Sequence, residues 1–96
     1  MKIGNDQLAA AGFVETTYDG QEGIFYTKRQ QAWDMPYVRE HIIDNEEVLP
    51  ETEVIVEVTP DQHVQMYIRD ADYAEGPFAL ESDEALGLLK DAGFPA

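Results

Sequence analysis

The chain contains no cysteine, so its fold can include no disulfide, no thiolate metal ligand and no cysteine nucleophile. The lack of cysteine also suits a cytoplasmic protein, because disulfides belong mainly to oxidising compartments. No apolar run reaches the ~18 residues that a membrane span needs, and the N-terminus lacks the pattern of a signal peptide. We therefore expect a cytoplasmic protein that does not insert into membranes.

Basic residues are also scarce. Six lysines and arginines face twenty acids, which gives a formal net charge of −14. Such a charge repels nucleic acids and anionic membranes and attracts basic surfaces. Direct binding of DNA or RNA is therefore excluded, and a basic protein surface is the expected partner. The alternative is that the acidity serves only solubility.

The residues needed for catalysis are largely missing. Ser82 is the only serine, and its expected role is to cap a helix. His41 and His63 are far apart in the sequence, and no glycine-rich phosphate-binding loop is present. The many carboxylates offer pairs for acid–base chemistry, but no pair stands out from the others. The sequence therefore predicts a protein that is not an enzyme and has no cofactor.

A metal site receives only partial support from the sequence. Asp70, Asp72 and Glu81 occupy the first, third and twelfth positions of a calcium-binding loop. Ala74 occupies the fifth position, however, and a strand rather than a helix precedes this segment. We therefore predict no metal site, and a carboxylate metal-binding protein is the third of three hypotheses.

The most regular pattern in the chain covers residues 53–69 and predicts a β-hairpin. Apolar residues alternate along two runs, 53–58 and 64–69, and Pro60-Asp61 supplies the turn between them. One register makes one face wholly apolar and the other mixed, and it fixes the pairing. In that register Glu57 and Gln65 face water on the other side. The cross-strand pairs are Val54 with Ile68, Ile55 with Tyr67, Val56 with Met66, Val58 with Val64, and Glu53 with Arg69.

A second hairpin is predicted from residues 13–18 and 23–28. Asp19-Gly20 is typical of a two-residue turn, which would place Val14 opposite Phe25 and Phe13 opposite Tyr26. Gly23 indicates a bulge or a close approach of another segment.

Helices are predicted near both ends of the chain. The first falls within residues 1–12, with Asn5 or Asp6 as its N-cap, and the last begins with Ser82 as N-cap. Both finish on the pattern Leu-x-x-Ala-Gly-Phe, in which Gly12 and Gly93 fit the left-handed position that closes a helix.

The middle of the chain is harder to interpret. We expect a loop at 29–37, then a segment at 35–44 that fits a helix, with Asp34 as N-cap and Pro36 in its first turn, and also fits a strand. Helix is slightly favoured. Acidic connections follow at 44–52 and 70–75, and 78–80 is expected to form a short edge strand. Together these elements predict one α+β domain, residues 1–96, in which an antiparallel sheet built from two hairpins carries two or three short helices on one face.

Two runs of acids contain no intervening base, one from Glu40 to Glu57 and one from Asp70 to Glu84. Carboxylates spaced along a strand imitate the charge of a nucleic-acid backbone and would fit a basic groove. The loop before Pro36 adds aromatic residues of the kind that anchor interfaces. We therefore predict a partner-binding surface that consists of Trp33, Tyr37, Glu40, Asp44, Glu46, Glu47, Glu51, Glu53, Glu57, Asp70, Asp72 and Glu75.

In size, charge and lack of catalytic residues, the chain is similar to the small acidic proteins with which phages block host machinery. That class includes nucleic-acid mimics that inhibit defence complexes such as CRISPR systems. The first hypothesis is thus a non-enzymatic inhibitor that occupies a basic surface of a nucleic-acid-binding protein. The second is a structural or assembly module, in which a sheet edge or the Trp33 loop forms a homodimer.

Overall fold

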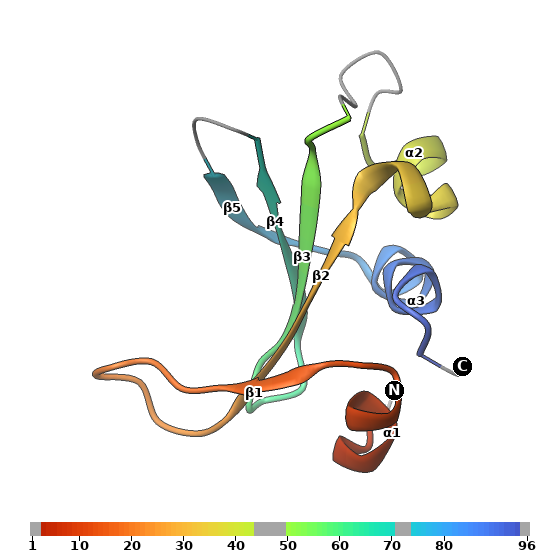
Figure 1. The fold of residues 1–96 in the computed structure, drawn as a ribbon. Helices are drawn as coiled ribbons and strands as arrows, with labels where there is room; N and C mark the ends of the chain where they lie inside the picture. The colour runs from red at the N-terminus through yellow and green to blue at the C-terminus, as the bar shows by residue number, and fades with distance from the viewer. Residues whose placement is uncertain (1–2, 44–49, 71–73, 95–96) are drawn as a thin grey trace.

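The protein is built on a five-stranded antiparallel sheet whose strands follow sequence order from β1 to β5 (Figure 1). This computed structural model describes residues 3–43, 50–70 and 74–94. The strands are β1 (Val14–Thr16), β2 (Phe25–Gln31), β3 (Glu53–Val58), β4 (Val64–Arg69) and β5 (Ala74–Ala79).

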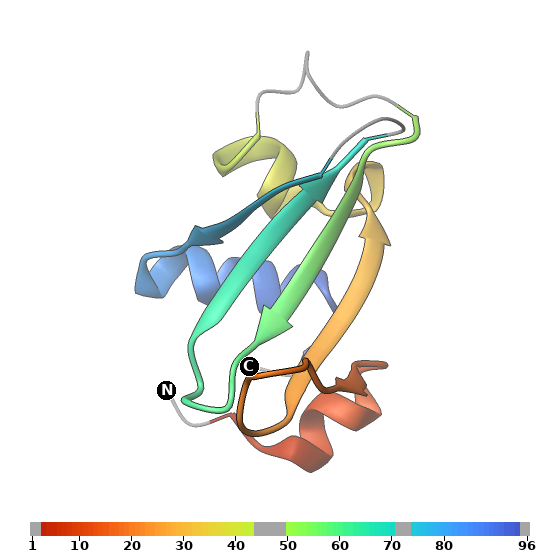
Figure 2. The ribbon, with the colours of Figure 1, turned by 90° about the vertical axis from the view of Figure 1, so that its left-hand side faces the viewer.

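The helices cover one face of this sheet. They are α1 (Asn5–Ala10), α2 (Pro36–His41) and α3 (Ser82–Asp91), and a 3-10 helix (Ala32–Asp34) precedes α2. Figure 2 views the other face, which we call the open face, with α2 and α3 behind the strands. The predicted α+β class, an antiparallel sheet with helices on one face, is confirmed.

The predicted register of the β3–β4 hairpin is confirmed at every position, from Glu53 opposite Arg69 to Val58 opposite Val64. The alternate apolar residues of this hairpin that begin with Val54 face the helices and are largely buried, whereas Ile55 and Tyr67 lie on the open face. Leu88 and Leu89 of α3 pack against them with no exposed surface. The main core residues from the hairpin are Val54, Val56, Val58, Val64 and Met66.

The predicted register of the first hairpin is wrong by two residues. Val14 pairs with Thr27, and Phe25 pairs with Thr16, because residues 17–24 form a longer loop than a two-residue turn. Within this loop Gly23 has a φ of 90° and passes against Pro60, where a β-carbon would lie 2.6 Å from the proline ring. The predicted close approach at Gly23 is confirmed, and it helps to explain why the loop is long.

The predicted loop at 29–37 is also wrong, because β2 continues to Gln31 by pairing with β3 as far as Glu53. The slight preference for helix at 35–44 is confirmed by α2, with Pro36 in its first turn and Met35, rather than Asp34, as N-cap. Residues 44–49 lie outside the described part of the chain.

Several predicted boundaries move by a few residues. The edge strand β5 begins at Ala74 rather than at 78, since it pairs with β4 from Arg69 onwards with a register shift. The N-cap of α3 is Glu81 rather than Ser82, and the N-cap of α1 is Gly4 rather than Asn5 or Asp6.

The shared Leu-x-x-Ala-Gly-Phe pattern forms the same helix ending twice, as predicted. Gly12 and Gly93 have φ angles of 95° and 90°. The two endings meet at Lys28, whose Nζ donates hydrogen bonds to the carbonyl oxygens of Ala11 (2.7 Å) and Ala92 (2.6 Å). One ammonium therefore stabilises the negative ends of α1 and α3 together.

Candidate functional site

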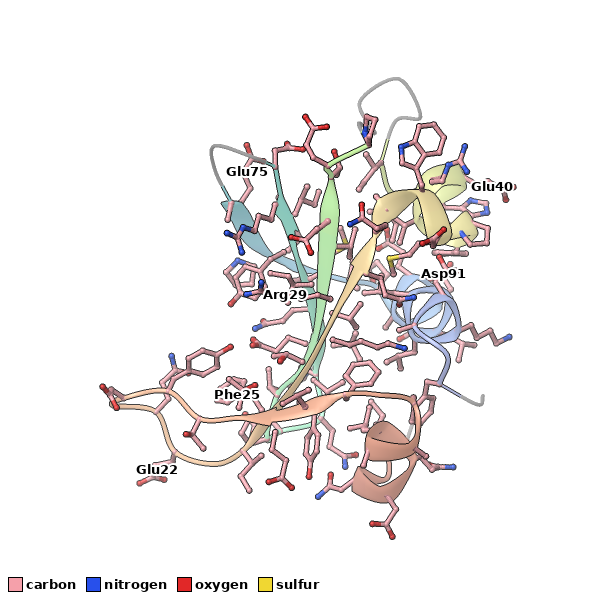
Figure 3. All side chains as sticks on the ribbon, in the orientation of Figure 1. Glu22, Phe25, Arg29, Glu40, Glu75 and Asp91 are labelled. Atoms are coloured by element: carbon pink, nitrogen blue, oxygen red, sulfur yellow. The ribbon has the colours of Figure 1, made fainter. Side chains whose placement is uncertain are left out.

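The described carboxylates predicted to bind a partner lie mostly at the end of the sheet where β3 begins and β4 ends. Glu51 and Glu53 are at the start of β3, Asp70 follows β4, and Glu75 is in β5. Figure 3 shows Glu75 and Glu40 at this end. The predicted residues Asp44, Glu46, Glu47 and Asp72 lie outside the described residues.

Arginines interrupt this group in space, although no base interrupts it in the sequence. Arg69 is directly opposite Glu53 on β4, and Arg29 lies on β2, the strand on the other side of β3. Asp70 is already engaged, because the hydroxyl of Thr52 donates a 2.7 Å hydrogen bond to it. The carboxylates at this end therefore share their surface with positive charge.

The two predicted aromatic anchors have different environments. Trp33 is 44% exposed, and the guanidinium of Arg39 stacks 4.2 Å from its ring centre. Tyr37 is half-buried between helices: its ring packs against Gly87 of α3 and lies 4.5 Å from the ring of His41. Trp33 thus remains available to a partner, whereas Tyr37 mainly joins α2 to α3.

A second group of acids lies at the opposite end of the sheet, where the β1–β2 loop and the β3–β4 turn meet (Figure 1). We call this the turn end. Its elements are α1, β1, residues 17–24 and residues 59–63, and none of them contains a lysine or arginine. Five exposed acids are carried by these elements: Asp6, Glu15, Asp19, Glu22 and Asp61. The prediction did not include them because they are scattered in the sequence.

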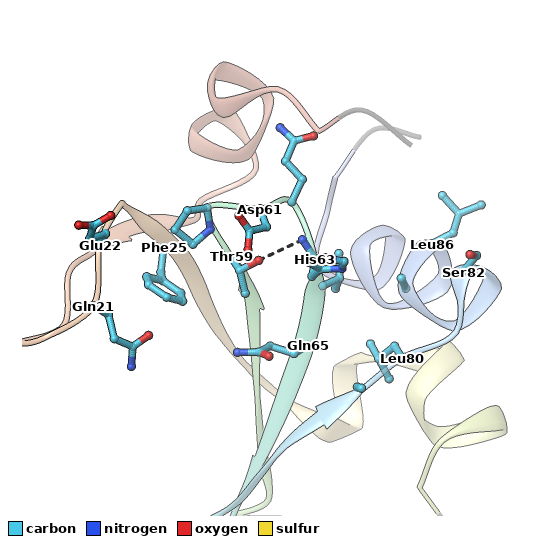
Figure 4. Close-up of a pocket in the computed structure, with 15 residues that line it drawn as sticks. Gln21, Glu22, Phe25, Thr59, Asp61, His63, Gln65, Leu80, Ser82 and Leu86 are labelled. Carbon is cyan, nitrogen blue, oxygen red and sulfur yellow. Dashed lines mark hydrogen bonds between the residues drawn. The ribbon is translucent and has the colours of Figure 1, made fainter.

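The turn end is hollowed by a groove of about 1090 Å³ (Figure 4). The β1–β2 loop contributes Glu22, the β3–β4 turn contributes Asp61, and the first turns of α3 contribute Leu86. The groove therefore combines exposed carboxylates with an apolar wall, which is a suitable arrangement for a basic segment that also carries apolar surface.

Ser82 and His63 line this same groove, although they are distant in sequence. In Figure 4 His63 lies near the start of β4 and Ser82 lies on α3, and the described structure shows no hydrogen bond between their side chains. The backbone N–H of His63 donates instead to the hydroxyl of Thr59, at 3.1 Å. His41 is on α2.

The expectation that Glu57 faces water is wrong. Glu57 lies on the open face, as the register requires, but it is only 1% exposed. Tyr18 from the β1–β2 loop folds over it and donates a 2.5 Å hydrogen bond to Oε2, while Nε2 of Gln65 donates a 2.6 Å hydrogen bond to Oε1. Glu57 therefore belongs to a covered polar cluster and not to the acidic surface.

The buried carboxylate changes the chemistry of its neighbours. The hydrogen bond to Glu57, burial and the charge of Glu57 together raise the pKa of Tyr18 to about 12. Burial and the same carboxylate raise the pKa of Tyr67 above its ordinary value. Both phenols therefore stay protonated well above neutral pH, and the proton of Tyr18 is the one that it donates to Glu57.

The described residues contain no group of three or more side chains suited to hold a metal ion. Asp70 and Glu81, from the partial calcium-loop match, are separated by the whole length of β5. Among the described helices, none is long and apolar enough to cross a membrane.

The chain matches no protein-family model, and neither the curated proteins nor the solved structures compared with it include a similar protein.

Proposed function

We propose that this protein is a non-enzymatic binding protein whose acidic turn end docks on a basic surface of a nucleic-acid-binding protein. The observation that carries this proposal is the separation of charge. The turn end has five exposed acids on elements without lysine or arginine, whereas Arg29 and Arg69 flank the acids of the other end.

Electrostatics favours such a contact over a long range. A net charge of −14 steers the chain towards basic surfaces and suppresses encounters with acidic ones. Large basic grooves are typical of proteins that bind phosphate backbones, and they gain affinity by releasing counterions. A protein that occupies such a groove competes with the nucleic acid and acts as an inhibitor.

The test is a displacement assay. Labelled duplex DNA is bound to each member of a panel of purified basic DNA-binding domains, and fluorescence anisotropy follows its release by this protein. We expect displacement from at least one member, with an affinity that falls steeply as salt increases. No displacement from any member would overturn the proposal.

Two matched triple variants locate the surface. Asp19→Asn, Glu22→Gln and Asp61→Asn neutralise the turn end, while Glu40→Gln, Glu51→Gln and Glu75→Gln remove the same charge from exposed residues at the other end. We expect only the first variant to lose displacement. Equal losses in both would show that net charge, rather than the turn end, determines binding.

The competing hypothesis is assembly through a sheet edge or through Trp33. The strand β5 is an exposed edge, but Pro77 lacks the N–H that a further strand would need. Light scattering tests this hypothesis: a dimer that becomes a monomer on Trp33→Ala, without displacement of DNA, would favour assembly.

A further inference from the structure

A second cavity, of about 390 Å³, lies on the open face and surrounds the Glu57 cluster. Its walls include three aromatic rings, those of Tyr18, Phe25 and Tyr67, together with the carboxylate of Glu57. Tyr18 and Phe25 meet edge to face, with ring centres 4.9 Å apart. The β1–β2 loop, the start of β2 and the strand β4 therefore build an aromatic enclosure around a buried acid.

This combination suits a positively charged organic group. The faces of aromatic rings are negative and attract ammonium and guanidinium groups. The described lining contains no basic side chain, and its other polar members are the amides of Gln21 and Gln65. Nothing in the described lining would repel a cation, and an anion would meet Glu57.

Glu57 retains capacity to bind a further donor. A carboxylate offers about four lone-pair positions; Tyr18 and Gln65 each donate to one of its two oxygens, and Tyr67 also hydrogen-bonds to it, which leaves room for one further donor. Within the described residues, Glu57 forms no ion pair. Neither of the two arginines on this face lies directly across a strand from Glu57. In the strand register Arg29 is opposite Ile55, and Arg69 is opposite Glu53. A buried carboxylate gains most from a cation that enters its cavity.

The cavity adjoins the groove at the turn end. Gln21, Phe25 and Gln65 line both of them, so a chain seated in the groove has direct access to the aromatic enclosure. We propose that the open-face cavity binds the ammonium group of a lysine side chain that the basic partner inserts beside Glu57. The assignment of this lysine to a basic partner rests on the proposed function, whereas the cation site itself is inferred from the cavity alone.

Nuclear magnetic resonance titration tests the cation site without any partner protein. The probes are the blocked lysine N-acetyl-lysine methylamide, the neutral N-acetyl-norleucine methylamide, free butylammonium, and a Gly-Gly-Lys-Gly-Gly peptide. We expect the blocked lysine and the peptide to shift the backbone signals of Phe25, Glu57 and Gln65, and norleucine to leave them unchanged. No shift with any amine would overturn the cation site.

Variants separate the carboxylate from the aromatic ring. Glu57→Gln keeps the size of the side chain and should weaken lysine binding by about tenfold or more, the effect of losing a charged hydrogen bond. Glu51→Gln removes the same charge from the other end and should leave the affinity within about twofold, because exposed charges beyond the Debye length are screened.

Two variants of Tyr18 provide a second test, which stays informative even if Glu57→Gln does not fold. Tyr18 lies in an exposed loop, so its replacement spares the core. Tyr18→Leu removes the ring and should weaken binding by about fivefold, whereas Tyr18→Phe should retain most of it. Equal affinities for these two variants and the wild type would overturn the aromatic part of the inference.

The outcomes distinguish the two proposals. Binding of butylammonium but not of the peptide would overturn the assignment to a protein side chain. DNA displacement without any amine binding would overturn the cation site and leave the proposed function standing. Amine binding without displacement from any panel member would overturn the proposed function and, with it, the assignment of the lysine to such a partner.

Discussion

The hydroxyl of Tyr18, in the β1–β2 loop, donates a hydrogen bond of 2.5 Å to Oε2 of Glu57, which lies on β3. This bond and the edge-to-face contact of the Tyr18 ring with Phe25 hold the β1–β2 loop over the open face. The loop covers a carboxylate that the strand pattern would leave in water, and the Tyr18 ring forms part of the wall of the aromatic cavity.

The titration of Tyr18 should report this bond. Its pKa in the folded protein is about 12, against 10.0 for the free side chain. The neutral phenol therefore contributes stability that is fully present below pH 10 and is lost as the pH rises towards 12. Tyr18→Phe should remove the latest step of the tyrosine titration followed by ultraviolet absorbance, and Glu57→Gln should move that step towards pH 10. A late step that persists in Tyr18→Phe would contradict this assignment.

Lys28 should be a major contributor to stability despite its charge. Lys28→Met keeps an apolar stem but removes the hydrogen bonds to Ala11 and Ala92, so we expect unfolding free energy to fall by about 2–4 kcal/mol. Urea denaturation measures this loss. Lys90→Met, an exposed change on α3, is the control and should cost less than about 0.5 kcal/mol. Similar losses in both variants would argue against the shared cap.

Replacing Gly87 with alanine should lower the stability of the protein, the opposite of the usual effect of this change within a helix. Alanine normally stabilises a helix by about 1 kcal/mol relative to glycine. At Gly87 a β-carbon would lie 2.5 Å from the ring of Tyr37, so Gly87→Ala should instead destabilise by about 1–3 kcal/mol. In a Tyr37→Ala background the clash disappears, and the same change should be neutral or stabilising. Thermal unfolding of the four proteins measures the coupling between the two residues.

Asp91 should act as a remote cap for α2. Its Oδ2 accepts a 3.0 Å hydrogen bond from the backbone N–H of Val38, in the first turn of a helix whose N-cap is the apolar Met35. Asp91→Ala should cost about 1 kcal/mol, the typical loss for an N-cap. Asp91→Asn keeps an acceptor and should cost less, because burial raises the pKa of the carboxyl and makes its charged form less favourable. Chemical denaturation of both variants would show the difference.

The parts of the fold that could be predicted are those in which nearby residues carry the information. Alternation along residues 53–69 allowed only one register that buries all the valines, and it is the register found. Gly12 and Gly93 could be assigned because a left-handed residue after a helix favours glycine over other residues. The register of the β1–β2 hairpin could not be predicted, because the length of its loop depends on contacts with residues distant in the sequence, Pro60 and Glu57.

The sequence predicts an acidic binding surface from the excess of acids, and that function stays a prediction. The places where the acids gather on the folded molecule could not be read from runs in the sequence, because strands place distant residues side by side. Arg69 lies directly opposite Glu53 and Arg29 lies opposite Ile55, two residues further along the same strand. Glu22 and Asp61, in contrast, meet at the groove of the turn end through two separate connections.

The sequence by itself determined the fold class, the central hairpin and both glycine helix endings, since each follows from spacing within a short segment. Only the tertiary structure decided that Lys28 joins the two helix endings, that Glu57 is enclosed and that the acids of the turn end lie apart from the arginines. The physical reason is that charge and burial act across space, between strands and loops that the chain brings together only when it folds.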